Sequence, residues 1–216
     1  MDKIDYLLIR DFLPENEVNA VLQELDFIRS SGQLVDPEQS GSARQDQKVL
    51  KKNKAIFLAD VYRRPDYSPT MSLVVKKLFQ GITGQYANMS LWNRGVIKTN
   101  QARSMVSYYE ESDLYLPHDD VSVVTVLYWV WKEPKSFTGG DFILHDVDEI
   151  IPVTNNTLLL FPGHCTHSVS PVRMNADSKE GFGRWCVTTF LLTGVGADSG
   201  FECYLTDGGG HQQGLP

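Results

Sequence analysis

Two short segments of the sequence combine residue types that bind metal ions. The segment YLPHDD places His118 two residues before Asp120, and the later segment LLLFPGHCTHSVSPV contains His164 and His167. In an extended strand, residues two apart point to the same face, so His118 and Asp120 would present an imidazole and a carboxylate side by side. A histidine from a neighbouring strand would complete three ligands on one side of an ion, a set typical of ferrous iron sites that keep other positions open.

Each of the two motifs offers a competing ligand. His164 directly follows a Pro-Gly pair and is expected in a turn, whereas His167 begins an alternating run and is expected where a strand starts. Asp119 would point away from His118 in an extended chain, which favours Asp120. The sequence therefore predicts a metal site made by His118, Asp120 and His167. The alternative interpretation is a solvated turn and a core strand with an incidental histidine.

An arginine could complete the chemistry of this site. Arg184 begins the segment RWCVTTFLL, in which alternate residues share one face of a strand. If that face lines the interior of a barrel, the buried guanidinium needs an anionic partner. A dicarboxylate ligand would suit its bidentate geometry, and Thr188 offers a hydroxyl on the same face. The alternative partner is a protein carboxylate at the rim. Arg173, in the turn after VSPV, is the lesser candidate for binding a ligand.

The composition describes an ordinary globular chain. With 216 residues, of which 42% are hydrophobic and 22% charged, it is long enough for one domain with a substantial core. The net charge of -7 argues against nucleic-acid partners, and the basic run at Lys48 and 51–54 is interpreted as a solvated loop. The spacing of the three cysteines matches no zinc site and no disulfide framework. The first residues do not have the pattern of a signal peptide, and no window approaches the roughly 18 apolar residues of a membrane span. We therefore expect a cytoplasmic protein without a membrane partner, of undetermined oligomeric state.

Periodicity divides the chain into a mixed first part and a β-rich second part. Residues 6–9 and 55–62 read as strands, one helix follows Pro14, and a second amphipathic helix is expected to be capped by Thr70. The polar residues 33–54 are expected to form a long mobile loop, either a substrate lid or disordered. From about residue 96, six strands separated by turns are predicted, at 104–109, 121–131, 141–145, 157–161, 167–172 and 184–193.

The absence of helical patterns between these strands favours an antiparallel double-sheet barrel or jelly roll, with the first helices covering one sheet. We expect one domain over residues 1–216. Residues 1–102 would support a core at 103–193, and the glycine-rich tail from residue 194 to 216 would fray.

The order of HDD, GGDFILH, LLLFPGHCTHSVSPV and GRWCVTTFL resembles the catalytic core of iron(II)- and 2-oxoglutarate-dependent dioxygenases, specifically the prolyl 4-hydroxylase-like branch. The resemblance covers about residues 103–193. It implies a mainly β (α+β) fold, the double-stranded β-helix. It also implies Fe(II), 2-oxoglutarate and dioxygen, with ascorbate as a further candidate. The implied reaction is hydroxylation of a C–H bond in a prolyl residue of a peptide or protein, or in a free amino acid or similar small molecule.

The resemblance also assigns residues. It implies His118, Asp120 and His167 as iron ligands and Arg184 as the partner of the distal carboxylate of 2-oxoglutarate. Further contacts to the co-substrate are implied for Tyr109, Thr188 and Trp129, the last of which stands where several relatives have a tyrosine. The carboxylate of the His-x-Asp motif favours hydroxylation over halogenation. The competing hypothesis is a non-catalytic cupin-like barrel that binds a metal or another ligand, which would not need a buried arginine facing the metal.

Overall fold

Two antiparallel sheets form the body of the protein, as the spacing of the strands predicts. A computed structural model describes them within residues 4–194, so the predicted tail lies, apart from Gly194, outside the described residues. The larger sheet has the order β1 (Leu7–Ile9), β11 (Thr157–Pro162), β7 (Val124–Val130), β14 (Arg184–Leu192), β5 (Gln101–Tyr109) and β4 (Lys54–Phe57). The smaller has the order β10 (Glu149–Ile151), β9 (Phe142–Leu144), β12 (His167–Val169) and β6 (Tyr115–His118).

Alternating side chains of the larger sheet enter two different cores. On β7 and β14, Tyr128 and Val187 belong to the core between the sheet and the helices, whereas Leu127, Trp129 and Cys186 belong to the core between the two sheets. This alternation follows from the two-residue period of a strand, which points successive side chains to opposite faces. The cavity described below lies on the side of the smaller sheet.

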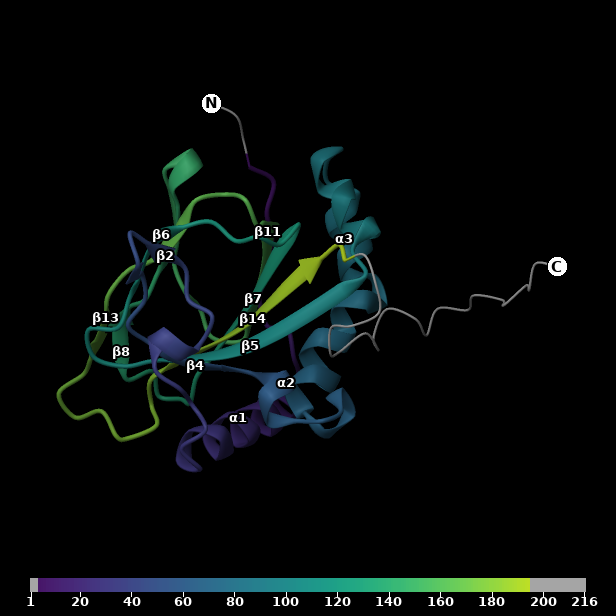
Figure 1. Ribbon diagram of the computed structural model, residues 1–216. Coiled ribbons are helices and arrows are strands. Elements are labelled where there is room, and N and C mark those ends of the chain that lie inside the picture. The colour runs from purple at the N-terminus through teal and green to yellow at the C-terminus, as the bar shows by residue number, and fades with distance from the viewer. Residues whose placement is uncertain (1–3, 195–216) are drawn as a thin grey trace.

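Helices cover the outer face of the larger sheet, as expected (Figure 1). Helix α1 (Glu15–Ser30) packs through Val21, Leu25 and Ile28. A helical stretch then contains two π-helical segments, Met71–Val75 and Leu78–Ile82, and ends in α3 (Thr83–Ala87). No helix within the described residues has the length and apolarity needed to cross a membrane.

The second helix begins differently from the prediction. Thr70 has helical backbone angles and no capping hydrogen bond from its side chain. Instead, the Ser68 hydroxyl accepts a hydrogen bond of 3.1 Å from the backbone N–H of Met71, while the Thr70 N–H donates to the Glu24 carboxylate at 2.7 Å. A serine and a threonine two residues apart are both good caps, so only the contact with helix α1 decides between them.

Two predicted strands are divided in the structure. The stretch 55–62 forms β4 and then a short helix, α2 (Leu58–Val61), because the pairing of β4 with β5 ends at Phe57. The stretch 167–172 is split between β12 and β13 (Val172–Met174), which pairs with β8 (Phe137–Gly139). Pro171 lies between them and has no N–H to donate to a strand ladder.

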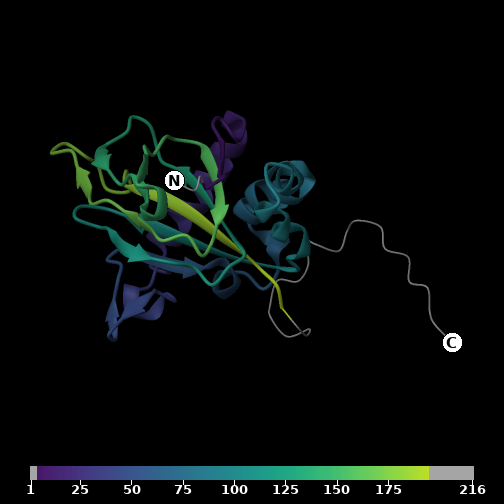
Figure 2. The same ribbon diagram turned by 90° about the horizontal axis from the view of Figure 1, so that it is seen from above.

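The segment 33–54 contains regular structure that the sequence did not predict. It carries a small hairpin, β2 (Arg44–Gln45) with β3 (Lys48–Val49), which projects from the body of the sheets (Figure 2). Its last residues return to the barrel, where Lys51 and Asn53 are buried. The interpretation of the basic run as a wholly solvated loop is therefore wrong for Lys51.

Candidate active site

Three side chains from two neighbouring strands and the turn after one of them meet between the sheets. His118 ends β6 and His167 begins β12, and the two residues are direct partners in the antiparallel register. Asp120 lies 3.9 Å from the Nε2 of His118 through one carboxylate oxygen and 3.6 Å from the Nε2 of His167 through the other. One nitrogen or oxygen atom of each residue lies within 4.8 Å of the others, which is close enough for one ion to contact all three.

The position of Asp120 does not follow from strand alternation. Strand β6 ends at His118, and the Asp120 N–H donates a 2.8 Å hydrogen bond to the carbonyl of Gly163. The Thr125 hydroxyl donates a 2.6 Å hydrogen bond to the Asp120 carboxylate. A Cβ on Gly163 would lie 2.3 Å from the carbonyl oxygen of Ser122, so the turn needs a glycine. The Pro-Gly turn of the second motif therefore positions the carboxylate of the first.

Both histidines are oriented by the backbone in the same way. The Nδ1 of His118 donates to the Leu116 carbonyl and that of His167 to the Cys165 carbonyl, each at 2.8 Å. This fixes the tautomer and leaves each Nε2 lone pair free to bind a metal. The pKa of each histidine is lowered to about 4, for both mainly by burial and for His118 also by the neighbouring His167. Both imidazoles are thus neutral at pH 7, the form that binds metals.

The carboxylate is tuned by opposing effects. Burial raises the pKa of Asp120, and the Thr125 hydrogen bond lowers it. Two neutral imidazoles and one carboxylate on one side of an ion form a donor set that suits Fe(II). The residues present therefore fit the iron of the family that the sequence resembles.

Arg184 is buried in the same cavity without an anionic partner. Its exposed fraction is 0%, and none of its three guanidinium nitrogens has a hydrogen-bond partner among the described residues. The guanidinium lies 4.8 Å from the ring centroid of Tyr109 and 5.8 Å from that of Trp129. A Cβ on Gly140 would approach the Arg184 Cδ to 2.9 Å, so glycine at this turn makes room for the arginine. A buried, unpaired guanidinium fits a carboxylate ligand.

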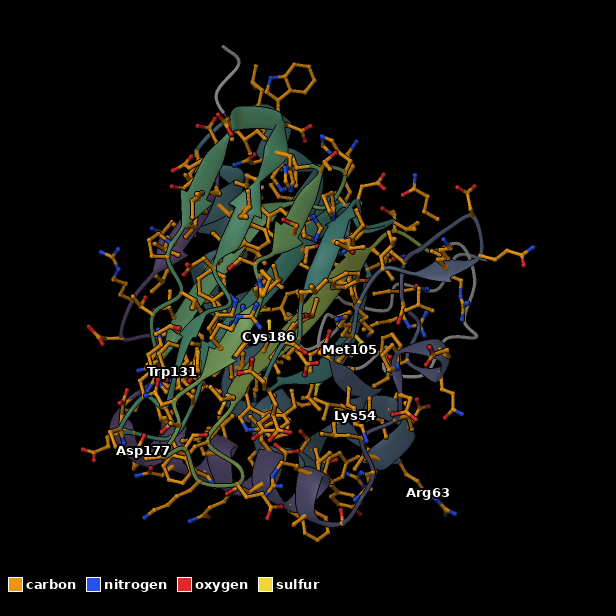
Figure 3. The ribbon with its side chains drawn as sticks, turned by 90° about the vertical axis from the view of Figure 1, so that its left-hand side faces the viewer. Lys54, Arg63, Met105, Trp131, Asp177 and Cys186 are labelled. Atoms are coloured by element: carbon orange, nitrogen blue, oxygen red, sulfur yellow. The ribbon has the colours of Figure 1, made fainter. Side chains whose placement is uncertain are left out.

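The cavity joins the three-residue cluster to the arginine. Tyr109 and Thr188 line it together with Arg184 and the cluster, and Cys186 and Met105 mark its wall in Figure 3. Trp129 is fully buried beside Arg184 but does not line the cavity, and its indole nitrogen has no nitrogen or oxygen acceptor among the described residues.

The competing residues lie elsewhere. His164 and Asp119 are exposed and stand outside the cluster. Arg173 is exposed and pairs with Glu111 at 3.1 Å, so it does not face the cavity.

Two contacts of the cluster were not found from the sequence. Thr125 has no motif around it, and only the structure shows its bond to Asp120. Tyr115 stacks on His118 with 3.6 Å between ring centroids. Its position three residues before His118 was the available signal, but the sequence left open whether Tyr115 packs in the core or lines a substrate groove.

Comparison with known proteins gives a family match over part of the chain. Residues 104–192 match the model of the 2OG-Fe(II) oxygenase superfamily. No curated protein matches the chain in sequence. Members of this superfamily use Fe(II), 2-oxoglutarate and dioxygen, as predicted.

Many solved structures share the fold, among them the following three. A prolyl hydroxylase from Trichoplax adhaerens, in complex with a hypoxia inducible factor oxygen degradation domain peptide fragment, has a TM-score of 0.64 and 18% identity; the match covers 87% of this chain and 83% of that one. A Pseudomonas putida prolyl-4-hydroxylase has a TM-score of 0.60 and 14% identity, with coverage of 89% and 95%. NgTET1 in complex with 5mC DNA has a TM-score of 0.55 and 12% identity, with coverage of 87% and 72%.

These likenesses confirm the predicted double-stranded β-helix. Because the fold also occurs in a complex with DNA, it does not by itself exclude nucleic acid, and the absence of such a partner stays a prediction. Residues 104–192 match the 2OG-Fe(II) oxygenase superfamily, and the chain shares its fold with the two prolyl hydroxylase structures.

Proposed function

We propose that the protein is an Fe(II)- and 2-oxoglutarate-dependent hydroxylase that acts on a prolyl residue of a peptide or protein, or on a free amino acid. One observation carries this proposal. A single cavity contains a His–Asp–His cluster and a buried guanidinium that has no partner among the described residues. The metal cluster alone would fit many barrels, whereas the unpaired arginine beside it fits a co-substrate with a carboxylate.

In this proposal, His118, Asp120 and His167 would hold Fe(II) and leave room at the ion for 2-oxoglutarate and dioxygen. The iron, when bound with 2-oxoglutarate, supplies oxidation of a substrate C–H bond coupled to decarboxylation of the co-substrate to succinate. The two backbone carbonyls behind the imidazoles keep each Nε2 aimed at the ion.

Arg184 binds the distal carboxylate of 2-oxoglutarate, and its burial strengthens that contact because water does not compete. Thr188, on the same face of β14, offers a hydroxyl to the co-substrate, and Tyr109 packs against the guanidinium. Trp129 packs against the guanidinium of Arg184 and does not line the cavity. The apolar wall formed by Leu127, Phe142 and Val169 excludes water from the reacting atoms.

The prolyl preference is supported by the two prolyl hydroxylase structures that share the fold. Asp120 favours hydroxylation, because a carboxylate at this position occupies the site that a halide would need. A non-catalytic barrel, the competing hypothesis, would leave Arg184 buried and unpaired, an arrangement that costs free energy without a ligand.

Two measurements test the proposal. Anaerobic protein is mixed with Fe(II) and 2-oxoglutarate, and the visible absorption band of the chelated pair is recorded; succinate release is then measured with prolyl peptides and free amino acids. We expect the band with wild-type protein and substrate-dependent succinate with at least one prolyl compound. A protein that binds Fe(II) but never shows the band would be a metal-binding barrel and not an oxygenase.

A further inference from the structure

Lys51 is buried without a carboxylate beside it. The residue is 4% exposed, and its amine contacts the Ser40 carbonyl at 3.4 Å and the Met105 sulfur at 4.0 Å. Among the described residues, no Asp or Glu oxygen lies within 4.0 Å of it, whereas Lys54 of the same segment pairs with Asp36 at 3.5 Å. Lysine is almost never fully buried without a partner, so an anion from outside the described chain would satisfy Lys51.

The backbone ties Lys51 to the strand of the first metal-binding histidine. Lys52 donates its N–H to the Leu114 carbonyl at 3.1 Å, and Leu116 donates to the Leu50 carbonyl at 2.8 Å, so Lys51 and Tyr115 are bridge partners. The amine of Lys51 lies 5.9 Å from the centroid of the Tyr115 ring, which stacks on His118. One aromatic ring therefore separates the buried amine from the metal cluster.

The cavity has a cation near each of two positions on the inner face of β5. Arg184 lies over Tyr109, and Lys51 contacts Met105, four residues earlier on the same strand. Four residues of a strand span about 13 Å. In the proposed function Arg184 binds the distal carboxylate of 2-oxoglutarate and the keto acid end would lie at the iron, so a carboxylate beside Lys51 would belong to the other substrate.

A groove leads from the metal cluster toward the segment that carries Lys51. It is lined by Ser42, Phe57, Arg103, Asp119 and Asp120, among others. Among the charged residues that line this groove, Arg103 is positive, and Asp119 and Asp120 are negative. Lys51 does not line the groove itself, but it belongs to the same segment, 33–54, as the lining residue Ser42. Burial lowers the pKa of Lys51 to about 8, and the amine is still largely protonated at neutral pH.

We propose that Lys51 binds a carboxylate of the substrate that is oxidised, and so selects acidic substrates. The inference rests on the proposed hydroxylase function. The carboxylate could be an acidic side chain next to the target residue of a peptide, or the α-carboxylate of a free amino acid. Both present the same anion to the ammonium, and the experiment separates them.

The test uses two matched pairs of probes. One pair is a prolyl peptide with Glu beside the proline and its Gln counterpart; the other is free L-proline and L-prolinamide. Binding of each probe to anaerobic protein with Fe(II) and 2-oxoglutarate is measured through the change in the visible absorption band, and turnover through succinate release. The variants are Lys51→Met, which keeps the length of the side chain, Lys51→Arg, which keeps the charge, and Lys52→Met, which removes an exposed lysine next in sequence.

We expect wild-type protein and the Lys52→Met variant to prefer the carboxylate-bearing member of one pair by at least about ten-fold. Lys51→Met should lose this preference, and Lys51→Arg should keep part of it. The pair that shows the effect identifies the source of the carboxylate. If the absorption band forms but neither pair of probes shows a preference, this inference is wrong and the proposed function still stands. The same holds if the preference for the carboxylate survives in the Lys51→Met variant. Absence of the band in wild-type protein would overturn the proposed function as well.

Discussion

The two faces of the larger sheet use the same strands for different purposes. On β14, Trp185 and Val187 pack under the helices, while Arg184 and Thr188 face the cavity. The outer face buries apolar surface, which stabilises the fold. The inner face buries a guanidinium that no described residue neutralises, which costs stability in the absence of a ligand. The comparison predicts that changes on the two faces separate stability from activity.

The largest effect is expected at the metal cluster. Asp120→Ala removes the only carboxylate of the three-residue set, so we expect substrate-dependent succinate release to fall at least about a hundred-fold. The free energy of unfolding should change little or increase, because a buried carboxylate is lost. Succinate assays with saturating Fe(II), together with urea unfolding, check both parts. Normal coupled turnover in this variant would refute the ligand assignment.

A change on the outer face should have the opposite pattern. Leu160 is fully buried beneath the helices, and Leu160→Ala should lower the free energy of unfolding by about 2–5 kcal/mol. The apparent 2-oxoglutarate requirement of the folded protein should not change. Urea unfolding and succinate kinetics on the same preparation measure both quantities. If the 2-oxoglutarate requirement rose as strongly as stability fell, the two faces would not be independent.

The arginine should matter for the co-substrate and not for the fold. Arg184→Met removes a charge-assisted, bidentate contact worth on the order of 2–4 kcal/mol, so the apparent 2-oxoglutarate requirement should rise tens to hundreds of times. The melting temperature should stay the same or rise, since the guanidinium has no hydrogen-bond partner among the described residues to lose. Arg173→Met, at an exposed arginine paired with Glu111, is the matched control and should behave as wild type.

A smaller effect is expected at Thr125, whose hydroxyl donates a hydrogen bond to the Asp120 carboxylate. Thr125→Val keeps the side-chain shape and removes the 2.6 Å hydrogen bond to Asp120, which should weaken Fe(II) binding about ten- to a hundred-fold. Titration of anaerobic protein with Fe(II) in the presence of 2-oxoglutarate measures the affinity. Excess Fe(II) should restore most of the activity, and a variant that stays inactive at saturating iron would contradict a purely positioning role.

The smallest effect concerns pH. Burial lowers the pKa of Lys51 from 10.5 to about 8, so between these values the unfolded chain binds more protons than the folded one. The contribution of Lys51 to the free energy of unfolding therefore increases as pH rises from about 8 to 10.5, by on the order of 1–3 kcal/mol at most. Urea unfolding between pH 7.5 and 9.5 should show this rise in wild type and a flatter profile in Lys51→Met. Equal slopes would indicate that the amine is solvated.

Local patterns in the sequence were sufficient for much of the fold and for the three residues that the structure brings together in the candidate metal cluster. Apolar alternation identified the strands at 104–109, 157–161 and 184–193, because the two-residue period of a strand can be detected within a few consecutive residues. The same period put Trp129 and Tyr128 on opposite faces, where the structure has them. The choice of His167 over His164 followed from a Pro-Gly turn, which is also a local signal.

Tertiary structure decided the features that depend on segments far apart in the chain. Asp120 was expected beside His118 by alternation, but its position comes from the carbonyl of Gly163. Lys51 looked solvated within a basic run, and only its packing against Met105 shows that it is buried. From the sequence, the partner of Arg184 was either a bound ligand or a protein carboxylate at the barrel rim. In the structure, no carboxylate of the described residues forms a hydrogen bond with the guanidinium. These outcomes depend on contacts that no window of consecutive residues contains, because burial and charge pairing are set by the surroundings of a side chain and not by its neighbours in sequence.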